Sequence, residues 1–519
     1  MKVQFLSARE AADLIKDNST IATGGFVGIG VAEEIELELE NRYNETSHPR
    51  NVTLYYAAGQ GDGDSRAVNH LSPKGLLKRV VGGHWNLAPK LQKLAIDNEI
   101  EAYNFPQGVI SHMFRDAASN KPGTLSKVGL STFVDPDLEG GKLNTITKED
   151  LVKKVTVLDE EFLYYETPKL DYVLLRGTFA DEVGNISFEE EAVTLDATNM
   201  ATACKNNGGT VIVQVKDIVN QGSLHPKLVK LPNSLVDVVV KTSDPYKYHE
   251  QIFGEYYNPS YSGQTKKLLS TVEPPKLDNR KIIGRRAALE VKAYSTTNLG
   301  IGIPEVVGAV INEEGERDKI TLSVEAGPTG GVPAGGKSFG ASINPYAILD
   351  QDNQFDFYDG GGLDITFLGL AQCDEKGNIN VSKFGPRIPG CGGFINISQN
   401  TKNVVFCGTF TAGGLKEEIK DGQLHIIQEG REKKFIKAVE QVTFSSSYAI
   451  KTNQNVKYIT ERCVMVLTDK GLMITEIAKG IDLEKDIINQ MEFKPLIAKD
   501  LKLMDERIFK DQLMGLQLK

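Results

Sequence analysis

Lys319-Ile-Thr-Leu-Ser-Val-Glu-Ala-Gly-Pro-Thr-Gly-Gly-Val-Pro-Ala-Gly-Gly336 combines a strand pattern, a carboxylate and a run of small residues. From Ile320 to Val324, aliphatic residues alternate with hydroxyl residues, which predicts a short strand. Glu325 comes next, and glycine, alanine and proline dominate the residues after it. Glycine lets a backbone approach a ligand closely and expose its amides. A carboxylate at a strand end beside such a loop suits a nucleophile with amides ready for an oxyanion.

A second copy of this strand occurs near the start of the chain. Asn51-Val-Thr-Leu-Tyr-Tyr-Ala-Ala-Gly59 aligns with Lys319-Ile-Thr-Leu-Ser-Val-Glu-Ala-Gly327, and Ala57 stands where the later copy has Glu325. The repeat therefore predicts one copy with the carboxylate and one without it.

Two further pairs of blocks occur in the same order along the chain. Gly28-Ile-Gly-Val-Ala-Glu33 matches Gly300-Ile-Gly-Ile-Pro-Glu305, and the stretch from Tyr172 to Ser187 matches the stretch from Ile365 to Asn380. We therefore expect two homologous halves: residues 1–265 without the nucleophile, a linker at 266–280, and residues 281–519 carrying Glu325.

Nearly continuous apolar runs alternate with helical patterns in both halves, for example Gly209–Val215 and Asn403–Cys407. Such runs are typical of parallel strands that are buried on both faces. The predicted fold class is α/β, with two homologous open α/β domains and mainly parallel sheets in one chain. Sheets of this kind bind ligands beyond the carboxyl ends of their strands.

Composition narrows the class of protein. The chain has 519 residues, of which 40% are hydrophobic and 25% charged, with a net charge of −10. A negative balance argues against nucleic acid or an anionic membrane as the main partner. The first ten residues carry charges too early for a secretory signal, and we find no apolar run long enough for a membrane span.

The cysteines indicate a reducing compartment, so we expect a cytoplasmic protein. Their number is odd and no C-x-x-C spacing occurs, which favours free thiols and argues against a metal site. The seven histidines are scattered along the sequence. The five cysteines are Cys204, Cys373, Cys391, Cys407 and Cys463.

Two nucleotide-binding motifs are matched only in part. The Gly-Ile-Gly blocks have Glu33 and Glu305 where a dinucleotide fingerprint needs a third small residue. We read them instead as loops that offer backbone amides before helices. The stretch 331–338 fits the P-loop expression, but it does not follow its strand directly and Gly340 and Pro345 oppose a long helix after it.

Two further glycine-rich loops, Asp359–Asp364 and Pro389–Phe394, lie in the second half. Taken singly each is an ordinary turn, whereas together with 327–336 they suggest a cleft lined by backbone. Cys391 is an alternative nucleophile, although no histidine lies near it in the sequence.

With these motifs in view, the chain resembles the family I CoA-transferases, and most of all the bacterial propionate/acetate CoA-transferases. The resemblance covers nearly the whole chain. The matching motifs are Thr23–Phe26, Pro106–Gly108, Ser323–Gly327, Gly330–Gly336, Tyr358–Asp364, Cys373–Asn380 and Gly390–Ile397.

The resemblance implies that Glu325 attacks an acyl-CoA thioester and forms an acyl-glutamyl anhydride and then a glutamyl-CoA thioester. It implies that Gly25, Phe26, Gly300 and Gly302 are candidate oxyanion donors and that Gln107 lies beside the nucleophile. It also implies that Gly392 and Gly393 belong to a loop that closes on the pantetheine arm of CoA. Coenzyme A would be a substrate and covalent intermediate, with no permanently bound cofactor.

Two other functions stay open at this point. A thioesterase on the same scaffold would let water attack the anhydride, and would need a general base that the sequence does not reveal near Glu325. A CoA-sensing or scaffold protein would be expected to have lost the nucleophile from both halves. The sequence does not choose among acetate, propionate, butyrate, lactate and acrylate, and the resemblance implies a homodimer or homotetramer.

Overall fold

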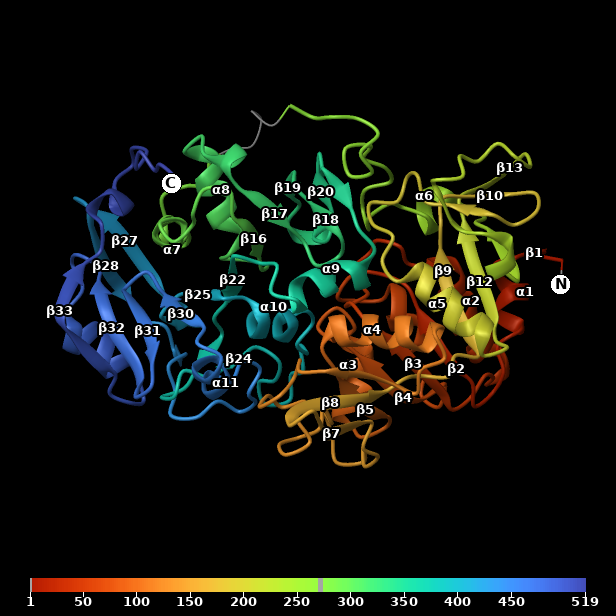
Figure 1. Ribbon diagram of the computed structural model, residues 1–519, viewed down its shortest axis with the longest axis horizontal. Coiled ribbons are helices and arrows are strands. Elements are labelled where there is room, and N and C mark those ends of the chain that lie inside the picture. The colour runs from red at the N-terminus through yellow and green to blue at the C-terminus, as the bar shows by residue number, and fades with distance from the viewer. Residues whose placement is uncertain (1, 269–273) are drawn as a thin grey trace. The chain divides into compact units, whose positions relative to one another are not determined.

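The computed structural model in Figure 1 describes residues 2–268 and 274–519, so part of the predicted linker lies outside the described residues. The chain forms two compact units. Unit 1 comprises Met1–Lys267, Val324–Asp356 and Phe384–Asn396, and unit 2 comprises Leu268–Ser323, Phe357–Lys383 and Ile397–Lys519. The predicted halves are defined by sequence similarity and stay a prediction. Compact packing instead groups two later segments, one of which contains Glu325, with the N-terminal residues.

Unit 1 is built on an eight-stranded sheet in the order β1-β15-β12-β9-β2-β3-β4-β5. Every neighbouring pair in this sheet is parallel. The strands are β1 (Gln4–Leu6), β2 (Thr20–Thr23), β3 (Val52–Tyr56), β4 (Leu77–Gly82), β5 (Glu101–Asn104), β9 (Tyr172–Arg176), β12 (Thr210–Val215) and β15 (Val238–Lys241).

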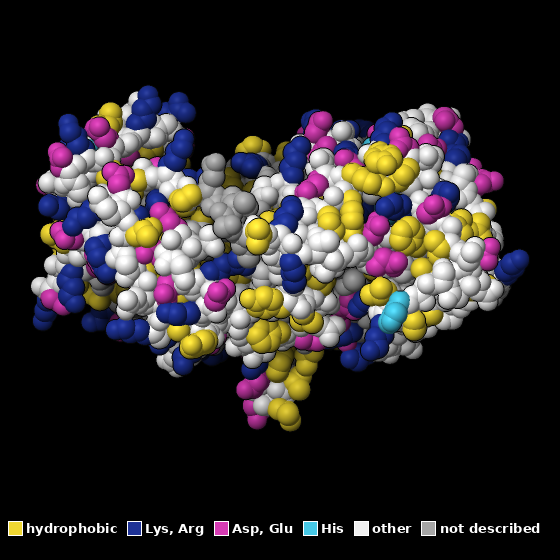
Figure 2. Space-filling view, turned by 90° about the horizontal axis from the view of Figure 1, so that it is seen from above, with side chains coloured by type: hydrophobic (Ala, Val, Ile, Leu, Met, Phe, Trp, Pro, Cys, Tyr) yellow, Lys and Arg dark blue, Asp and Glu magenta, His cyan; other side chains and the backbone are white. Residues whose placement is uncertain are grey.

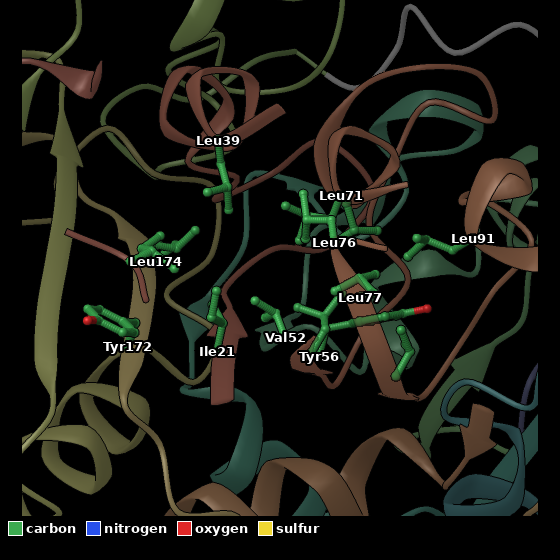
Figure 3. Packing of buried hydrophobic residues seen from close by; sticks show 14 of the residues in the cluster. Ile21, Leu39, Val52, Tyr56, Leu71, Leu76, Leu77, Leu91, Tyr172 and Leu174 are labelled. Carbon is green, nitrogen blue, oxygen red and sulfur yellow. The ribbon is translucent and has the colours of Figure 1, made fainter. Parts of the chain in front are cut away.

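The core of unit 1 forms because its central strands are apolar on both faces. All five residues of β9 are buried, as are four of the five in β3. Figure 3 shows Ile21, Val52, Tyr56 and Leu174 from the strands, with Leu39 above them from α2. The helices of this unit are α1 (Ala8–Asp13), α2 (Glu33–Thr46), α3 (Pro89–Ile96), α4 (Gln107–Ala118), α5 (Ala197–Asn206) and α6 (Pro245–Tyr248); α9 (Gln351–Asp359) and α10 (Phe394–Asn400) begin here.

The sheet of unit 2 is parallel at one side and mixed at the other. Strands β17, β16, β22, β25 and β30 are neighbours in that order and parallel. Strand β31 is antiparallel to both β30 and β32, and β33 is parallel to β32. The strands are β16 (Thr296–Leu299), β17 (Thr321–Ser323), β22 (Ile365–Gly369), β25 (Asn403–Cys407), β30 (Asn455–Ile459), β31 (Cys463–Thr468), β32 (Gly471–Ile477) and β33 (Leu496–Leu503); the helices are α7 (Asn279–Ala288), α8 (Glu305–Glu313) and α11 (Ser446–Lys451).

The two sheets repeat the same strand order and the same register. Strand order β3-β2-β9-β12-β15 in unit 1 corresponds to β17-β16-β22-β25-β30 in unit 2. Thr20 pairs with Thr53 in unit 1, and Thr296 pairs with Thr321 in unit 2. The next pairing also corresponds, because β2 meets β9 at Tyr172 while β16 meets β22 at Ile365. The alignment of blocks made from the sequence is therefore the alignment of the strands.

The third pair of sequence blocks forms the same turn in both units. Asp181 Oδ1 accepts the backbone N–H of Asn185 at 2.8 Å, and Asp374 Oδ1 accepts that of Asn378 at 2.9 Å. In each turn the asparagine side chain also donates to the second aspartate oxygen at 2.9 Å. These polar residues therefore have a structural function.

On the face of the molecule in Figure 2, Lys and Arg side chains are interspersed with Asp and Glu side chains. In the part of the chain that the structure describes, no helix is both long and apolar enough to cross a membrane.

Smaller sheets complete both units. The remaining strands are β6 (Gly123–Ser126), β7 (Val152–Val157), β8 (Glu160–Glu166), β10 (Phe179–Asp181), β11 (Ile186–Ser187), β13 (Asp217–Val219), β14 (Val229–Leu231), β18 (Pro328–Thr329), β19 (Val332–Pro333), β20 (Ser342–Ile343), β21 (Ala347–Ile348), β23 (Gln372–Cys373), β24 (Ile379–Asn380), β26 (Thr411–Ala412), β27 (Lys416–Lys420), β28 (Gln423–Gln428) and β29 (Glu432–Lys433).

Candidate active site

Glu325 occupies a tight turn that is fixed on both sides. The Gly327 N–H donates to the Val324 carbonyl oxygen at 3.0 Å, and the Val324 N–H donates to Pro328 at 2.9 Å. Gly327 has φ +126°, and a Cβ there would lie 2.1 Å from the Leu349 carbonyl oxygen. Only glycine tolerates both constraints. The glutamate therefore lies in a turn whose conformation requires glycine at position 327.

The two neighbours of Glu325 are core residues. Val324 is 3% exposed and Ala326 is fully buried, and both belong to an apolar cluster with Phe26 and Ala58. Glu325 itself lies between them with intermediate exposure. Packing thus anchors the turn, while the residue with the carboxylate keeps access to the surface.

The loops after β2, β3, β4 and β5 share one edge of the unit 1 sheet, because parallel strands end at the same edge. Their backbones are closely packed there. A Cβ at Gly83 would lie 1.9 Å from the Ala57 carbonyl oxygen and 3.3 Å from Gln107 Cα. A Cβ at Gly340 would lie 2.5 Å from the Phe26 ring. The chain at Gly340, just beyond the glycine-rich stretch 327–336, thus packs against the loop that follows β2.

Gln107 and Gly392 come together at this edge. Gln107 begins α4, and its backbone N–H donates to the Gly392 carbonyl oxygen at 2.9 Å. The Gly392 N–H donates in turn to Gly83 at 2.7 Å. The Asn104 side chain donates to Gly83 at 2.6 Å and accepts from the Cys391 N–H at 2.9 Å. The loop containing Gly392 and Gly393 is therefore attached to the ends of β4 and β5.

The four residues predicted as oxyanion donors differ in the hydrogen bonds that their backbone N–H groups make. The Phe26 N–H donates to Ile29 at 2.9 Å, and the Gly300 N–H donates to Phe367 at 2.8 Å. In this conformation neither offers the N–H that the role requires. Gly25, at φ +156°, has no backbone acceptor for its N–H among the described residues. Gly302 lies in unit 2, and its amide faces the carboxyl group of Glu305.

Cys391 has the environment of a structural cysteine. Its side chain is buried, and burial holds the pKa of its thiol well above the ordinary value. The thiolate is the nucleophilic form of cysteine, and a buried, apolar setting suppresses it. Cys391 is thus a poor alternative to Glu325.

His84 reaches the Cys391 loop although it is remote from it in sequence. A Cβ at Gly59 would lie 2.6 Å from His84 Nδ1, and one at Gly392 would lie 3.6 Å from its ring. Burial lowers the pKa of His84 to about 4, so the imidazole is neutral at pH 7. Sequence reasoning missed this residue, as it missed Gln351, whose side chain contacts Gln107. A histidine just past a strand with a glycine pair, Gly82-Gly83, was the available signal.

The P-loop match has no P-loop structure. Residues Gly336–Ser338 form a single 3₁₀ turn, and Lys337 is exposed. The phosphate cradle of a P-loop requires a helix that begins at this point. Within residues 2–268 and 274–519 no group of three or more His, Cys, Asp or Glu side chains could hold a metal ion.

Comparison with known proteins extends these observations. The family model described as coenzyme A transferase matches residues 5–242. Acetate CoA-transferase YdiF of Escherichia coli (strain K12) is 45% identical over 519 residues, covering 100% of this chain and 97% of that protein. Caffeate CoA-transferase of Acetobacterium woodii is 45% identical over 518 residues, covering 99% of this chain and 98% of that protein.

Solved structures agree with this chain over its full length. The apoenzyme of the acyl-CoA transferase YdiF from Escherichia coli O157:H7 matches with a TM-score of 0.95 and 44% identity, over 100% of this chain and 98% of that one. A thioester complex of YdiF with CoA matches with a TM-score of 0.93 and 43% identity, over the same shares. The predicted fold class, α/β with mainly parallel sheets, is confirmed.

Proposed function

The chain belongs to the coenzyme A transferase family and is a CoA-transferase, and we propose that it exchanges CoA between short-chain carboxylic acids, with Glu325 as the nucleophile. The observation that carries the proposal is the Glu325 turn, held by the buried side chains of Val324 and Ala326. A group that forms two successive covalent intermediates must keep its position through both of them.

The first half-reaction transfers CoA to the enzyme. The Glu325 carboxylate attacks the thioester carbonyl of acyl-CoA and the carbon–sulfur bond breaks. CoA leaves as a thiolate, and a mixed acyl-glutamyl anhydride is formed. The thiolate then attacks the glutamyl carbonyl. The donor acid leaves as a carboxylate, and Glu325 becomes a glutamyl-CoA thioester.

The second half-reaction reverses these steps with the acceptor acid. The acceptor carboxylate attacks the glutamyl thioester and releases the CoA thiolate, which then attacks the acyl carbonyl of the new anhydride. Acyl-CoA leaves and the Glu325 carboxylate is restored. One thioester replaces another, so the exchange consumes neither ATP nor water, and coenzyme A is needed only as substrate and covalent intermediate.

Amide donors around the glutamate would stabilise the oxyanions of these steps. The Gly25 N–H and the Gln107 side-chain amide are the donors that we propose for unit 1. Gly392 and Gly393 lie in a loop that is fixed to the same sheet edge, which suits contact with the pantetheine arm. Gly302 and the remaining predicted donors, Phe26 and Gly300, would need a rearranged backbone.

Thioester hydrolysis is the alternative that the site favours less. Hydrolysis of the anhydride needs a water molecule and a general base with a pKa near the working pH. His84 lies close to Gln107, and its pKa of about 4 makes it a weak base. Asp196 has a pKa of about 7, but it is buried and both its carboxyl oxygens are bonded, to Ser111 and Gln351. We therefore propose transfer to a carboxylate as the dominant reaction.

We propose that acetate and propionate are among the acids that the protein accepts. The two named relatives share 45% identity with this chain and carry the names of very different acids, acetate and caffeate. Identity therefore does not select the acid, and an exchange panel with acetate, propionate, butyrate, lactate, acrylate and caffeate would. We also propose a homodimer or homotetramer, which light scattering after size exclusion measures.

The test of the proposed function is the covalent intermediate. Incubation with propionyl-CoA and no acceptor should add the mass of CoA to the peptide that contains Glu325. Borohydride should reduce this thioester to an alcohol. CoA attached to Cys391, or a wild-type protein that exchanges CoA without ever becoming labelled, would overturn the mechanism.

A further inference from the structure

Four buried side chains of unit 1 form a continuous hydrogen-bonded relay. Ser111 Oγ contacts Asp196 Oδ1, Gln351 Nε2 donates to Asp196 Oδ2 at 2.7 Å, and Gln107 Nε2 donates to Gln351 Oε1 at 3.0 Å. Their exposures range from 0% for Ser111 to 4% for Asp196. Ser111 and Gln107 are four residues apart on α4 and so share one face of that helix. The relay therefore begins and ends on the same helix.

The two middle members of the relay, Asp196 and Gln351, are held by the backbone. Asp196 directly precedes α5, and the Gln351 N–H donates to the Leu195 carbonyl oxygen at 3.1 Å. The residue that begins α9 is thus attached to the residue next to Asp196. This double attachment fixes the distance between the carboxylate of Asp196 and the side chain of Gln351.

The chemistry of each member sets the orientation of the next one. A carboxylate oxygen accepts hydrogen bonds, so Gln351 must present its NH2 group to Asp196. The oxygen of Gln351 then faces Gln107, which must present its own NH2 group in turn. The orientation of a glutamine amide is otherwise ambiguous, and a network of this kind resolves it.

Gln107 is left with one N–H that the relay does not use. Its Oε1 faces Gly392, where a Cβ would lie 3.8 Å away, and one of its two N–H bonds is directed to Gln351. Among the residues that the structure describes, no acceptor is recorded for the second N–H. This donor lies at the sheet edge where the loops after β3, β4 and β5 meet.

We propose that Asp196 and Gln351 are positioning residues, which turn the side-chain amide of Gln107 so that it donates a hydrogen bond to the reacting groups. The proposal rests on the proposed function, in which Gln107 supports the intermediates of Glu325. With the amide reversed, Gln107 would present its oxygen to a developing negative charge and would oppose the reaction.

The relay keeps its direction in either protonation state of Asp196. Burial raises the pKa of Asp196 to about 7, with Asp352 also raising it, while the bonds from Ser111 and Gln351 and the charge of His112 lower it. When the carboxyl group is neutral, its proton can sit on Oδ1 and be donated to Ser111 Oγ. Oδ2 then still accepts from Gln351, so the orientation of Gln107 is unchanged.

Two substitutions at Gln351 test the relay by kinetics. Gln351→Met removes the oxygen that orients Gln107, and loss of one oxyanion donor costs ~100- to 1,000-fold in kcat, so we expect a loss approaching this range with KM for propionyl-CoA nearly unchanged. Gln351→Glu keeps the orienting oxygen but places a second carboxyl group against Asp196. This pair must share a proton, so kcat of this variant should fall between pH 6 and pH 9 more steeply than that of the wild type.

Matched variants separate positioning from folding. Asp196→Asn can offer its oxygen to Gln351 and its NH2 group to Ser111, so it should recover most of the activity that Asp196→Leu loses. Gln214→Met is the control, because Gln214 is equally buried and bonds Glu34 and Tyr248 away from the relay. It should lower the midpoint of thermal unfolding and leave kcat close to that of the wild type.

The outcomes are distinguishable. If the wild type is active and Gln351→Met has the same kcat, the positioning role is wrong while the proposed function stands. A Gln351→Glu variant with the pH profile of the wild type would have the same consequence. If Gln351→Met does not fold, the isosteric Gln351→Glu and Asp196→Asn variants decide the question. A folded wild type without any CoA exchange would overturn the proposed function, and with it the positioning role.

Discussion

The Sγ atom of Cys391 lies 3.8 Å from the carbonyl oxygen of Gly83, in position for its thiol to donate a hydrogen bond. This contact joins the glycine-rich loop 390–393 to the end of β4, next to His84. It turns the cysteine inward, as part of the support for the loop. The nucleophile of the site is therefore to be sought elsewhere, and Glu325 is the residue that we propose.

Cys391→Ser should retain CoA exchange close to the wild-type rate, because a serine hydroxyl can also donate to Gly83. Thiol-directed alkylating reagents should react slowly with the native protein, since buried thiols are inert. Mass spectrometry of alkylated peptides and an exchange assay measure both effects. Rapid inactivation that coincides with labelling of Cys391 would assign it a direct chemical role.

Glu325→Ala should abolish exchange, because this change makes the second strand copy like the first, where Ala57 stands. Glu325→Asp should be impaired by ~100-fold or more, since a nucleophile displaced by roughly 1 Å loses about that much. Steady-state exchange between propionyl-CoA and acetate measures both variants. Adding Ala57→Glu to Glu325→Ala should not rescue activity, because the loop after Ala57 lacks the Gly-Gly-Val-Pro-Ala-Gly-Gly segment. A folded Glu325→Ala protein that stays fast would place the nucleophile elsewhere.

Lys337→Ala should leave exchange unchanged in the presence or absence of ATP, because Gly336–Ser338 forms a single turn and Lys337 is exposed. Calorimetric titration with ATP and Mg²⁺ gives an independent measurement. ATP binding to the wild type that the substitution removes would restore the P-loop interpretation.

His84 should make the folded protein less stable as the pH falls from about 6.5 towards 4. Its pKa is lowered to about 4 in the folded state from an ordinary value of 6.5, so in this range the unfolded chain binds more protons. Above pH 6.5 the effect vanishes. Urea unfolding of the wild type and of His84→Gln at several pH values measures it. Parallel pH dependences for the two proteins would contradict the assignment.

Arg176→Met should destabilise unit 1 by ~3–5 kcal/mol, the usual cost of leaving a buried charge without its partner. Arg176 Nη2 lies 2.8 Å from Glu191 Oε2, and both side chains are buried. Burial alone would raise the pKa of Glu191, but the charge of Arg176 and the hydrogen bonds that the Glu191 carboxylate accepts hold this pKa at about 2. Chemical denaturation measures the change, and the double variant Arg176→Met with Glu191→Met should recover part of the loss. A single variant as stable as the wild type would show that the pair contributes little.

The strand before Glu325, its repeat before Ala57 and the place of the glutamate at a strand end follow from the amino-acid sequence alone. Strand formation depends on local alternation and on apolar runs, which can be read directly from residues such as Ile320 to Val324. The alignment of Tyr172 with Ile365 was sufficient to predict which residues correspond in the two sheets, because homologous strands keep their register. Glycine at position 327 likewise reflects a local requirement, a positive φ beside the Leu349 carbonyl.

The residues that surround Gln107 could be identified from the three-dimensional packing but not from the sequence. Gln351 is 244 residues away from it in the sequence, and Asp196, which lies between the two, is 155 residues from Gln351. No sequence pattern links such positions, because their contact arises when separate helices pack on one sheet edge. The same holds for the amides of Phe26 and Gly300, whose hydrogen-bond partners depend on how the backbone pairs in three dimensions. Local periodicity therefore specified the elements, and long-range packing specified the polar network between them.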